Sequence, residues 1–289
     1  MTSIGIGQPE LPAVEAIRRK VVRAYDHAKV LADAETAYVD AEPSPYRVRR
    51  AIKTDFTEHV YYLQLDVPIP LDFSILLGEI VYNLRSALDQ CIFQLALDRT
   101  GVEKDTTMFP VFSSPGEYRR KGAWRIKFIG DGPRTLIESL QPYPNRSLPI
   151  HYSLFDLNNL ANADKHRAVH LWGLSFVFGE MEGATGARVD PTGFGEVLYD
   201  GAEIFRVFPE TPTNEMQVRR SVRAAVSIKN PTAAGRGVST NLWDLIADVR
   251  TLVNSLLDAL GAQNDPIVIG WPLHGSNAPR HCLTRQAGV

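Results

Sequence analysis

The sequence predicts an α+β protein built mainly from helices, and three observations lead to this class. Several long segments repeat apolar residues at three- and four-residue steps, which is the period of an amphipathic helix. Shorter segments between them are rich in aromatic and β-branched residues, as strands are. The hydrophobic content of 44% and the charged content of 22% are ordinary for a globular protein and exclude wholesale disorder.

The first elements are predicted to be one long helix and a hairpin. Pro12 suits the start of a helix over residues 12–39, because the N–H that proline lacks has no partner in a first helical turn. The helix should end before the segment AEPSP at 41–45. Two strands joined by a short turn are then expected at 46–53 and 60–67, which argues against a purely helical bundle.

The strongest helix signal covers residues 72–98. Its apolar residues fall within one stripe at about 100° per residue, and Gly101 is a natural stop. Residues 102–150 are rich in proline and glycine, so we expect irregular structure with a short helix at 135–140. A further helix is expected over about residues 152–163, from the spacing of its leucines and alanines.

The C-terminal half begins with strands and ends with a helix. Residues 168–178 are almost continuously apolar, which predicts a buried strand, and 196–208 and 218–228 fit further strands. A last helix is expected over 240–260, with Ser239 or Thr240 as its N-cap.

We expect these elements to form a single α+β domain over residues 1–265. Its helical core would lie at 72–165, and a mainly antiparallel sheet would come from 46–67 and 168–228. The N- and C-terminal helices would pack across that sheet. Residues 266–289 would form an extended tail.

Charge and cysteine content narrow the class of function. The net charge of −2 provides no global basic field toward nucleic acid or anionic membranes, although a local basic patch stays open. Cys91 lies in an apolar helical run and is expected to be a buried thiol, and with Cys282 it makes no disulfide framework. The N-terminal segment lacks the pattern of a signal peptide, and no apolar stretch reaches 18 residues, so we expect a cytoplasmic protein without a membrane span.

Common catalytic and cofactor motifs are not found. The sequence contains no GxxxxGK[ST] loop, no HExxH and no GxSxG, and its glycine-rich pieces have the wrong spacing to cradle phosphate. His166 and His170 stand four residues apart, which would suit a metal on a helix, but no third ligand is obvious. We therefore expect neither a metal nor a cofactor.

A first polar cluster lies in the central helix, in GEIVYNLRSALDQ at 78–90. Glu79, Asn83, Ser86 and Gln90 form a stripe opposite the apolar one. Solvated helix faces usually carry lysine and glutamate, so three uncharged polar groups indicate a surface covered by another element or by a second copy in a homodimer.

Arg85 and Asp89 belong to the same helix and stand at i,i+4. Two interpretations are open for them: a structural ion pair within the helix, or a functional arginine oriented by a carboxylate. Ion pairs of this kind are common on helices, which favours the structural interpretation.

A second polar cluster, NNLANADKHR at 158–167, ends the following helix. Asn159, Asn162 and His166 share one helix face, and the helix end also carries Asp164, Lys165 and Arg167. Cations at a helix C-terminus interact favourably with the helix dipole, which explains the cluster structurally. An imidazole flanked by two cations would equally bind phosphate or act as an acid or base.

Polar clusters are costly to bury alone, so we expect these two to meet. The helix that ends near Asp164 would then pack on the helix that carries Arg85. In that arrangement Asp89 would pair with Lys165 or Arg167, and Asp164 with Arg85.

The order of these segments resembles a widespread set of uncharacterised bacterial proteins. The resemblance covers most of residues 70–175 and rests on the pieces NLRSALDQ, FPVF, LQPY and LNN followed by DKHR. That set has no assigned activity, so the resemblance implies no reaction.

A looser resemblance is to the HEPN superfamily of small helical domains. Many members are metal-independent ribonucleases of toxin and defence systems, with an arginine, four to six residues and then a histidine at a dimer interface. Arg85 matches the arginine, but Gln90 stands at the histidine position and does not exchange a proton as histidine does. The resemblance implies an inactive or binding-only relative, or one in which His166 supplies the imidazole.

These observations leave two hypotheses and do not decide whether the protein is an enzyme. The first is a HEPN-like protein that handles RNA or nucleotides, as a ribonuclease or a degenerate binder. Arg85 would contact phosphate, Asp89 would orient it, and His166 would be the acid or base. The alternative is a non-catalytic dimerising module of a phage-related or defence system, in which both clusters hold the fold and the interface.

Overall fold

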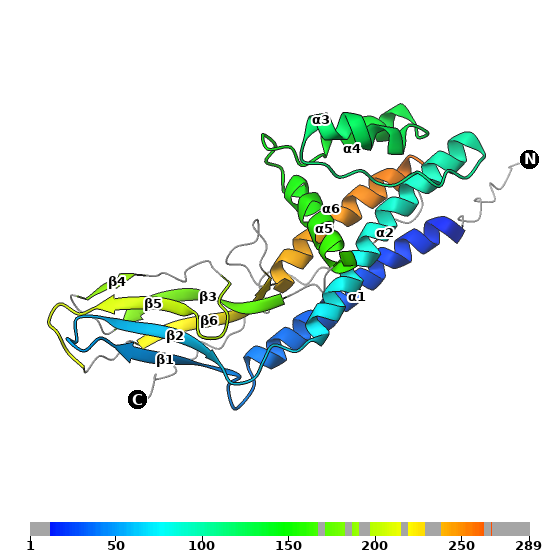
Figure 1. Cartoon of the computed structure of the whole chain (residues 1–289). Coiled ribbons are helices and arrows are strands. Elements are labelled where there is room, and N and C mark those ends of the chain that lie inside the picture. The colour runs from blue at the N-terminus through cyan, green and yellow to red at the C-terminus, as the bar shows by residue number, and fades with distance from the viewer. Residues whose placement is uncertain are drawn as a thin grey trace, which may run out of the picture. The chain divides into compact units, whose positions relative to one another are not determined.

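The computed structural model describes residues 12–166, 171–182, 187–190, 197–214, 219–228 and 238–262, together with Ile267. The helices and strands of this part confirm the α+β class (Figure 1). The helices are α1 (Pro12–Val39), α2 (Asp72–Thr100), α3 (Pro115–Glu117), α4 (Asp131–Ser139), α5 (Pro149–His166) and α6 (Val238–Asp258), with a π-helical turn η1 (Tyr118–Gly122) and a 3-10 turn η2 (Ala123–Ile126). The strands are β1 (Tyr46–Ile52), β2 (His59–Leu65), β3 (Leu171–Glu182), β4 (Arg188–Asp190), β5 (Glu203–Phe208) and β6 (Arg219–Ile228).

The chain divides into two compact units. Unit 1 comprises residues 1–28, 76–168 and 243–270, and unit 2 comprises 29–75, 169–242 and 271–289. Helices α1, α2 and α6 contribute residues to both units. The single domain expected over residues 1–265 stays a prediction. The predicted tail, 266–289, lies outside the described residues apart from Ile267.

The strands of unit 2 form antiparallel sheets. One sheet has four strands in the order β1-β2-β5-β4, and its β1–β2 hairpin pairs Tyr46 with Leu65 and Ile52 with His59. Strands β3 and β6 pair with each other in a second sheet, where the sequence had predicted one sheet. An isolated antiparallel bridge pairs Leu174 of β3 with Leu198, which precedes β5 in the chain. The three-residue strand β4 was not predicted, because so short a segment carries no readable alternation.

Helix α2 forms the hydrophobic centre of unit 1, as its apolar stripe predicts. Seven of its aliphatic side chains are 0% exposed: Leu77, Ile80, Val81, Leu84, Ala87, Leu88 and Ile92. Cys91 is buried beside them, and burial raises the pKa of its thiol to about 12, so it is an unreactive core residue.

Polar and aromatic contacts join the helices of unit 1. The rings of Tyr25 in α1 and Trp243 in α6 lie 5.3 Å apart, and His27 Nδ1 of α1 lies 3.2 Å from Glu79 Oε2 of α2. Ser153 of α5 donates a 2.6 Å hydrogen bond to Asp248 of α6. Gly101 and Gly261, which follow α2 and α6, have φ of +66° and +75°, so both helices end on the left-handed residue that their sequences predict. No helix in the described part is long and apolar enough to cross a membrane.

Candidate anion-binding site

Helices α2 and α5 approach closely at a glycine. An ideal Cβ built on Gly78 would lie 2.6 Å from Oδ1 of Asp164, closer than real Cβ atoms come to a neighbour. The lack of a side chain at position 78 therefore leaves room for the carboxylate of Asp164, at the end of α5, to lie over α2 (Figure 1). This is the proximity expected for the two polar clusters.

A cleft of about 130 Å³ opens along these two helices. It contains residues of both predicted clusters, namely Arg85 and Asp89 from α2 and Asp164 and Lys165 from α5. The other lining residues are Val81, Tyr82, Ser86 and Ala161.

Arg85 is fixed by an ion pair within its own helix. Its Nε and Nη2 donate to Oδ2 and Oδ1 of Asp89 at 3.3 and 3.0 Å, and Nη2 also donates to the carbonyl oxygen of Phe109. The backbone N–H of Phe109 in turn donates to Asp89 Oδ1 at 2.8 Å. Asp89 therefore orients the side chain of Arg85, and through its hydrogen bond to Phe109 it holds the segment after α2 against that helix.

This pairing differs from the contacts expected across the two helices. Asp89 pairs with Arg85, not with Lys165, and Asp164 does not pair with Arg85. At i,i+4 the two side chains already meet on adjacent turns, so the ion pair forms without any second helix. Asp164 and Lys165 are exposed and have no ion pair within the described part of the chain.

A glutamine that sequence analysis did not select completes this network. The side chain of Gln141 is 0% exposed. Its Oε1 accepts from the N–H of Phe112 at 2.9 Å, and its Nε2 donates to the carbonyl of Pro110 at 2.9 Å. The segments NLRSALDQ, FPVF and LQPY are thus held together by side chains that bond to backbone groups. A glutamine in a proline-bearing loop belongs to no periodic pattern. Its only sequence signal was its place in LQPY, one of the segments on which the resemblance to the uncharacterised bacterial proteins rests.

The charges around Arg85 do not balance. Its side chain is 11% exposed, and its Nη1 is buried without a hydrogen-bond partner. Burial lowers the pKa of Arg125, and the neighbouring charge of Arg85 lowers it further, while Asp89 acts in the opposite direction. Arg85, Arg125 and Asp89 together carry a net positive charge, to which the cleft lining adds one cation, Lys165, and one carboxylate, Asp164. The excess of one positive charge over these five groups suits an anion.

The other predicted residues lie apart from the lining of the cleft. Asn83 donates from Nδ2 to the carbonyl of Glu79 at 2.8 Å. Gln90 is half-buried, and Asn159 and Asn162 are exposed; none of the three lines the cleft. His166 is the last residue of α5, but its side chain lies outside the described part, as do Arg167 and His170.

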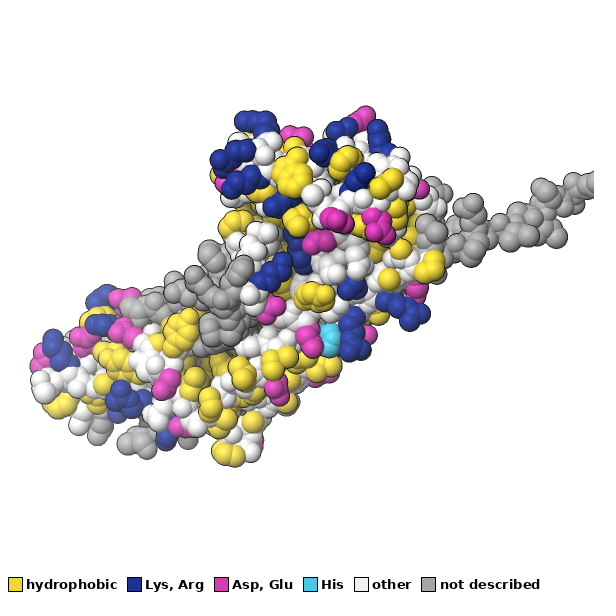
Figure 2. All heavy atoms as spheres, turned by 45° about the vertical axis from the view of Figure 1, so that its right-hand side comes forward, with side chains coloured by type: hydrophobic (Ala, Val, Ile, Leu, Met, Phe, Trp, Pro, Cys, Tyr) yellow, Lys and Arg dark blue, Asp and Glu magenta, His cyan; other side chains and the backbone are white. Residues whose placement is uncertain are grey.

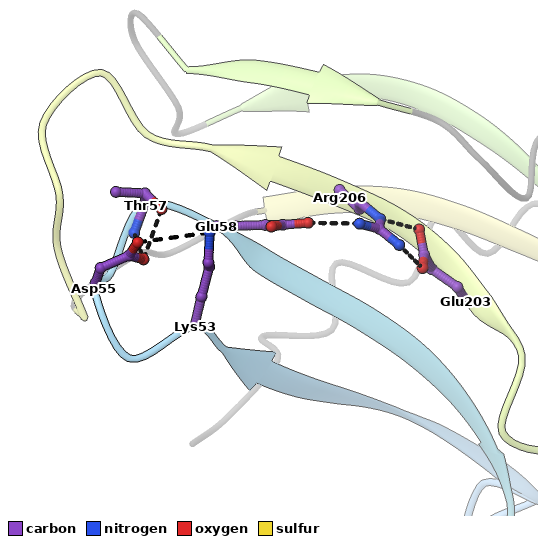
Figure 3. A network of polar contacts seen from close by, with 6 residues as sticks. All are labelled: Lys53, Asp55, Thr57, Glu58, Glu203 and Arg206. Atoms are coloured by element: carbon purple, nitrogen blue, oxygen red, sulfur yellow. Dashed lines mark hydrogen bonds and ion pairs between the residues drawn. The ribbon is translucent and has the colours of Figure 1, made fainter.

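Unit 2 contains a second arginine cluster of a different kind (Figure 3). Arg206 of β5 donates through Nη1 to Glu58 at 2.7 Å, and through Nε and Nη2 to the two oxygens of Glu203 at 2.6 and 2.7 Å. These carboxylates raise the pKa of Arg206. In the adjoining turn, hydrogen bonds from Thr57 lower the pKa of Asp55. Each side-chain nitrogen of Arg206 donates to a carboxylate, and two carboxylates face its single positive charge, so this cluster does not attract an anion.

Comparison with known protein families, curated proteins and solved structures finds no match. Among the described residues, no group of three or more His, Cys, Asp or Glu side chains is placed to hold a metal ion.

Proposed function

We propose that the protein binds RNA or a nucleotide through its phosphate at the cleft between α2 and α5. The observation that carries this proposal is the charge imbalance at Arg85, a fixed and buried guanidinium with one nitrogen unpaired beside a second arginine. A phosphate in the cleft would give Nη1 an acceptor and would offset the excess positive charge.

The cleft offers further groups that suit a nucleotide. Lys165 is an exposed cation on the α5 side, and the hydroxyl of Ser86 is a donor on the α2 side. Tyr82 is 60% exposed at the same cleft, and Lys20 Nζ lies over its ring at 5.4 Å, so a base would stack on the face that Lys20 leaves open. Arg85 and Lys165 would bind the phosphate, and Tyr82 would favour an aromatic base.

Cleavage of RNA would need an acid or base in addition to these groups. Under the HEPN-like proposal, His166 supplies this group, because Gln90 has no titratable proton and lies outside the cleft lining. Acid–base cleavage of RNA by this route uses no metal ion, and it leaves an RNA fragment with a cyclic phosphate end. Without His166 in place, the protein would be a degenerate member that binds and does not cut.

Binding is tested by titrating uridine monophosphate at low salt, where phosphate contacts are strongest. We expect one saturable site, weakened on the order of tenfold by Lys165→Ala through loss of a charge-assisted contact. Lys29→Ala removes an exposed lysine elsewhere and should leave binding unchanged. No binding by the wild type, or equal binding by Lys165→Ala, would contradict the proposal.

Cleavage is tested by incubating the wild type and His166→Ala with mixed RNA in EDTA. A metal-independent ribonuclease would produce cyclic phosphate ends with the wild type alone, while both proteins melt at the same temperature. Nucleotide binding without cleavage would identify a binder and exclude the nuclease.

A second candidate function, the non-catalytic dimerising module, is favoured by the outer side of α2. Tyr82 is 60% exposed there, and the uncharged side chains of Asn83, Ser86 and Gln90 are only half-buried. A second copy packed on this side would cover them. Light scattering at high concentration would then give twice the monomer mass of 32.1 kDa, and the Tyr82→Asp variant would be a monomer.

A further inference from the structure

A second basic feature of unit 1 lies in the segment between α3 and α4. Residues 117–128, here called the basic turn, contain five cations and one carboxylate: Arg119, Arg120, Lys121, Arg125, Lys127 and Glu117. The whole chain has a net charge of −2, so this positive charge is local. Figure 2 shows lysine and arginine side chains gathered at the level of α3 and α4.

Most of this charge is not neutralised by neighbours. Arg120 and Lys121 both lie 3.4 Å from the same oxygen of Glu117, so two cations share one carboxylate. Arg119 and Lys127 are exposed and form no ion pair within the described part of the chain. A surface of this composition attracts a polyanion such as a nucleic acid backbone.

The basic turn also exposes a large aromatic ring. Trp124 lies in η2 between the cations and is 44% exposed. Tyrosine and tryptophan rings that stay exposed beside cations are typical of surfaces on which unpaired bases stack. This combination favours single-stranded nucleic acid over an anionic protein, because an acidic peptide has no base to occupy the ring.

The turn is a firm platform and not a free loop. The side chains of Tyr118 and Ile126 are 3% and 1% exposed, and the ring of Tyr118 packs edge-on against Phe112 at 6.4 Å. The guanidinium of Arg125 lies over the same Phe112 ring at 5.4 Å. Phe112 is itself held by Gln141, so the anchor of the turn belongs to the network that fixes Arg85.

We propose that the basic turn binds single-stranded RNA, with its cations on successive phosphates and Trp124 stacked on a base. The choice of RNA rests on the proposed function, but the surface is distinct from the cleft between α2 and α5. The turn would bind the strand, and the cleft would take one of its phosphates.

The experiment is a titration of the full chain with a labelled oligouridylate at several salt concentrations, followed by fluorescence anisotropy. Arg120→Ala combined with Lys127→Ala should lower the slope of log affinity against log salt by about 1.4, because two single-strand phosphate contacts are lost. Trp124→Ala should weaken binding on the order of 10- to 100-fold, and Trp124→Phe should restore most of it. The control, Arg19→Ala combined with Arg23→Ala, removes two exposed cations of α1 and should keep the wild-type slope.

The outcomes separate this inference from the proposed function. Unchanged oligouridylate binding in the turn variants, or binding lost only in Lys165→Ala, would overturn the role of the turn. Weakened oligouridylate binding in the turn variants, with no binding of uridine monophosphate by the wild type, would support the turn and contradict the cleft. Equal losses in Trp124→Ala and Trp124→Phe would show that no base stacks on the ring and would overturn the inference as stated.

Discussion

Arg85 in unit 1 and Arg206 in unit 2 are both held by carboxylates, but the balance of charge around them differs. Arg206 has two carboxylates for its single charge, every side-chain nitrogen is bonded, and its side chain is 40% exposed. Arg85 has one carboxylate, a second arginine nearby and one buried nitrogen without a partner, at 11% exposure.

The comparison shows that an ion pair alone does not mark a site. A cluster in which carboxylates outnumber cations has a net negative charge and therefore repels an anion. A cluster in which cations outnumber carboxylates, beside an open cleft, has both charge and donors to offer. Unit 1 is therefore where we place ligand binding, and the cluster of unit 2 is structural.

The largest effects should come from the apolar side of the helix that carries Arg85. Leu84 and Leu88 are 0% exposed, so Leu84→Ala and Leu88→Ala should each cost about 2–5 kcal/mol of unfolding free energy. Neither side chain lines the cleft, so nucleotide affinity of the folded variants should not change. Urea unfolding measures the loss, and values below about 0.5 kcal/mol at both sites would show that α2 is peripheral.

Asp89→Ala should have the second largest effect on the free energy of unfolding, because it leaves the buried guanidinium of Arg85 without its counter-charge. Breaking a largely buried pair costs about 3 kcal/mol, and Phe109 also loses the acceptor of its N–H. Added inorganic phosphate should recover part of this stability by replacing the carboxylate. The matched variant Glu203→Ala in unit 2 should gain nothing from phosphate, since Arg206 keeps Glu58. An equal response of both variants would remove the distinction between the two clusters.

Asp248, a half-buried carboxylate that forms no ion pair among the described residues, gives a third, smaller effect. Burial raises the pKa of Asp248, the hydrogen bond from Ser153 offsets this in part, and Asp244 raises it further. Ser153→Ala should therefore raise the pKa of Asp248 and cost about 1–2 kcal/mol at neutral pH.

The pH dependence of that cost has a definite sign. A carboxyl whose folded-state pKa is raised binds its proton more tightly when folded, so its unfavourable effect grows as pH rises through the folded pKa. The deficit of Ser153→Ala should shrink as pH falls through the folded-state pKa of Asp248, which burial holds above its ordinary value, because Asp248 is then protonated in both proteins. Ser255→Ala, an exposed serine of α6, should show no such dependence. A deficit that is constant with pH would rule out this explanation.

Arg206→Gln should have the smallest effect of all. The ion pairs of Arg206 are partly exposed, and exposed pairs contribute little to stability. We expect a nearly unchanged melting temperature and unchanged nucleotide binding, measured by calorimetry. A loss of binding in Arg206→Gln would place the ligand in unit 2 and contradict the comparison.

The sequence predicts the regular parts of the fold because their signals are local and periodic. Helix α1 was predicted with its observed bounds, from Pro12 and a stripe of apolar residues at three- and four-residue steps. The hairpin of β1 and β2 and helix α2 also follow from period and composition.

The contacts that build the cleft are not periodic and could not be predicted in the same way. Gln141 bonds to backbone groups about thirty residues earlier in the chain, and η1 interrupts the helical period. The sequence did indicate Arg85 and Asp89, as an i,i+4 pair, and Asp164 and Lys165, as part of the charged end of the following helix. It also predicted the Arg85–Asp89 pair as a structural interpretation, but the pairs expected across the two helices were wrong, since the i,i+4 contact competes with them.

The most direct test of this account observes the two guanidinium groups while phosphate is added. In NMR spectra of arginine-labelled protein, with signals assigned through Arg85→Lys and Arg206→Lys, inorganic phosphate is titrated at low salt. The account predicts a saturable shift of the Arg85 side-chain signals and none for Arg206. Signals of Arg85 that do not move, or that move in step with those of Arg206, would contradict the claim that the cluster in unit 1 is an anion site.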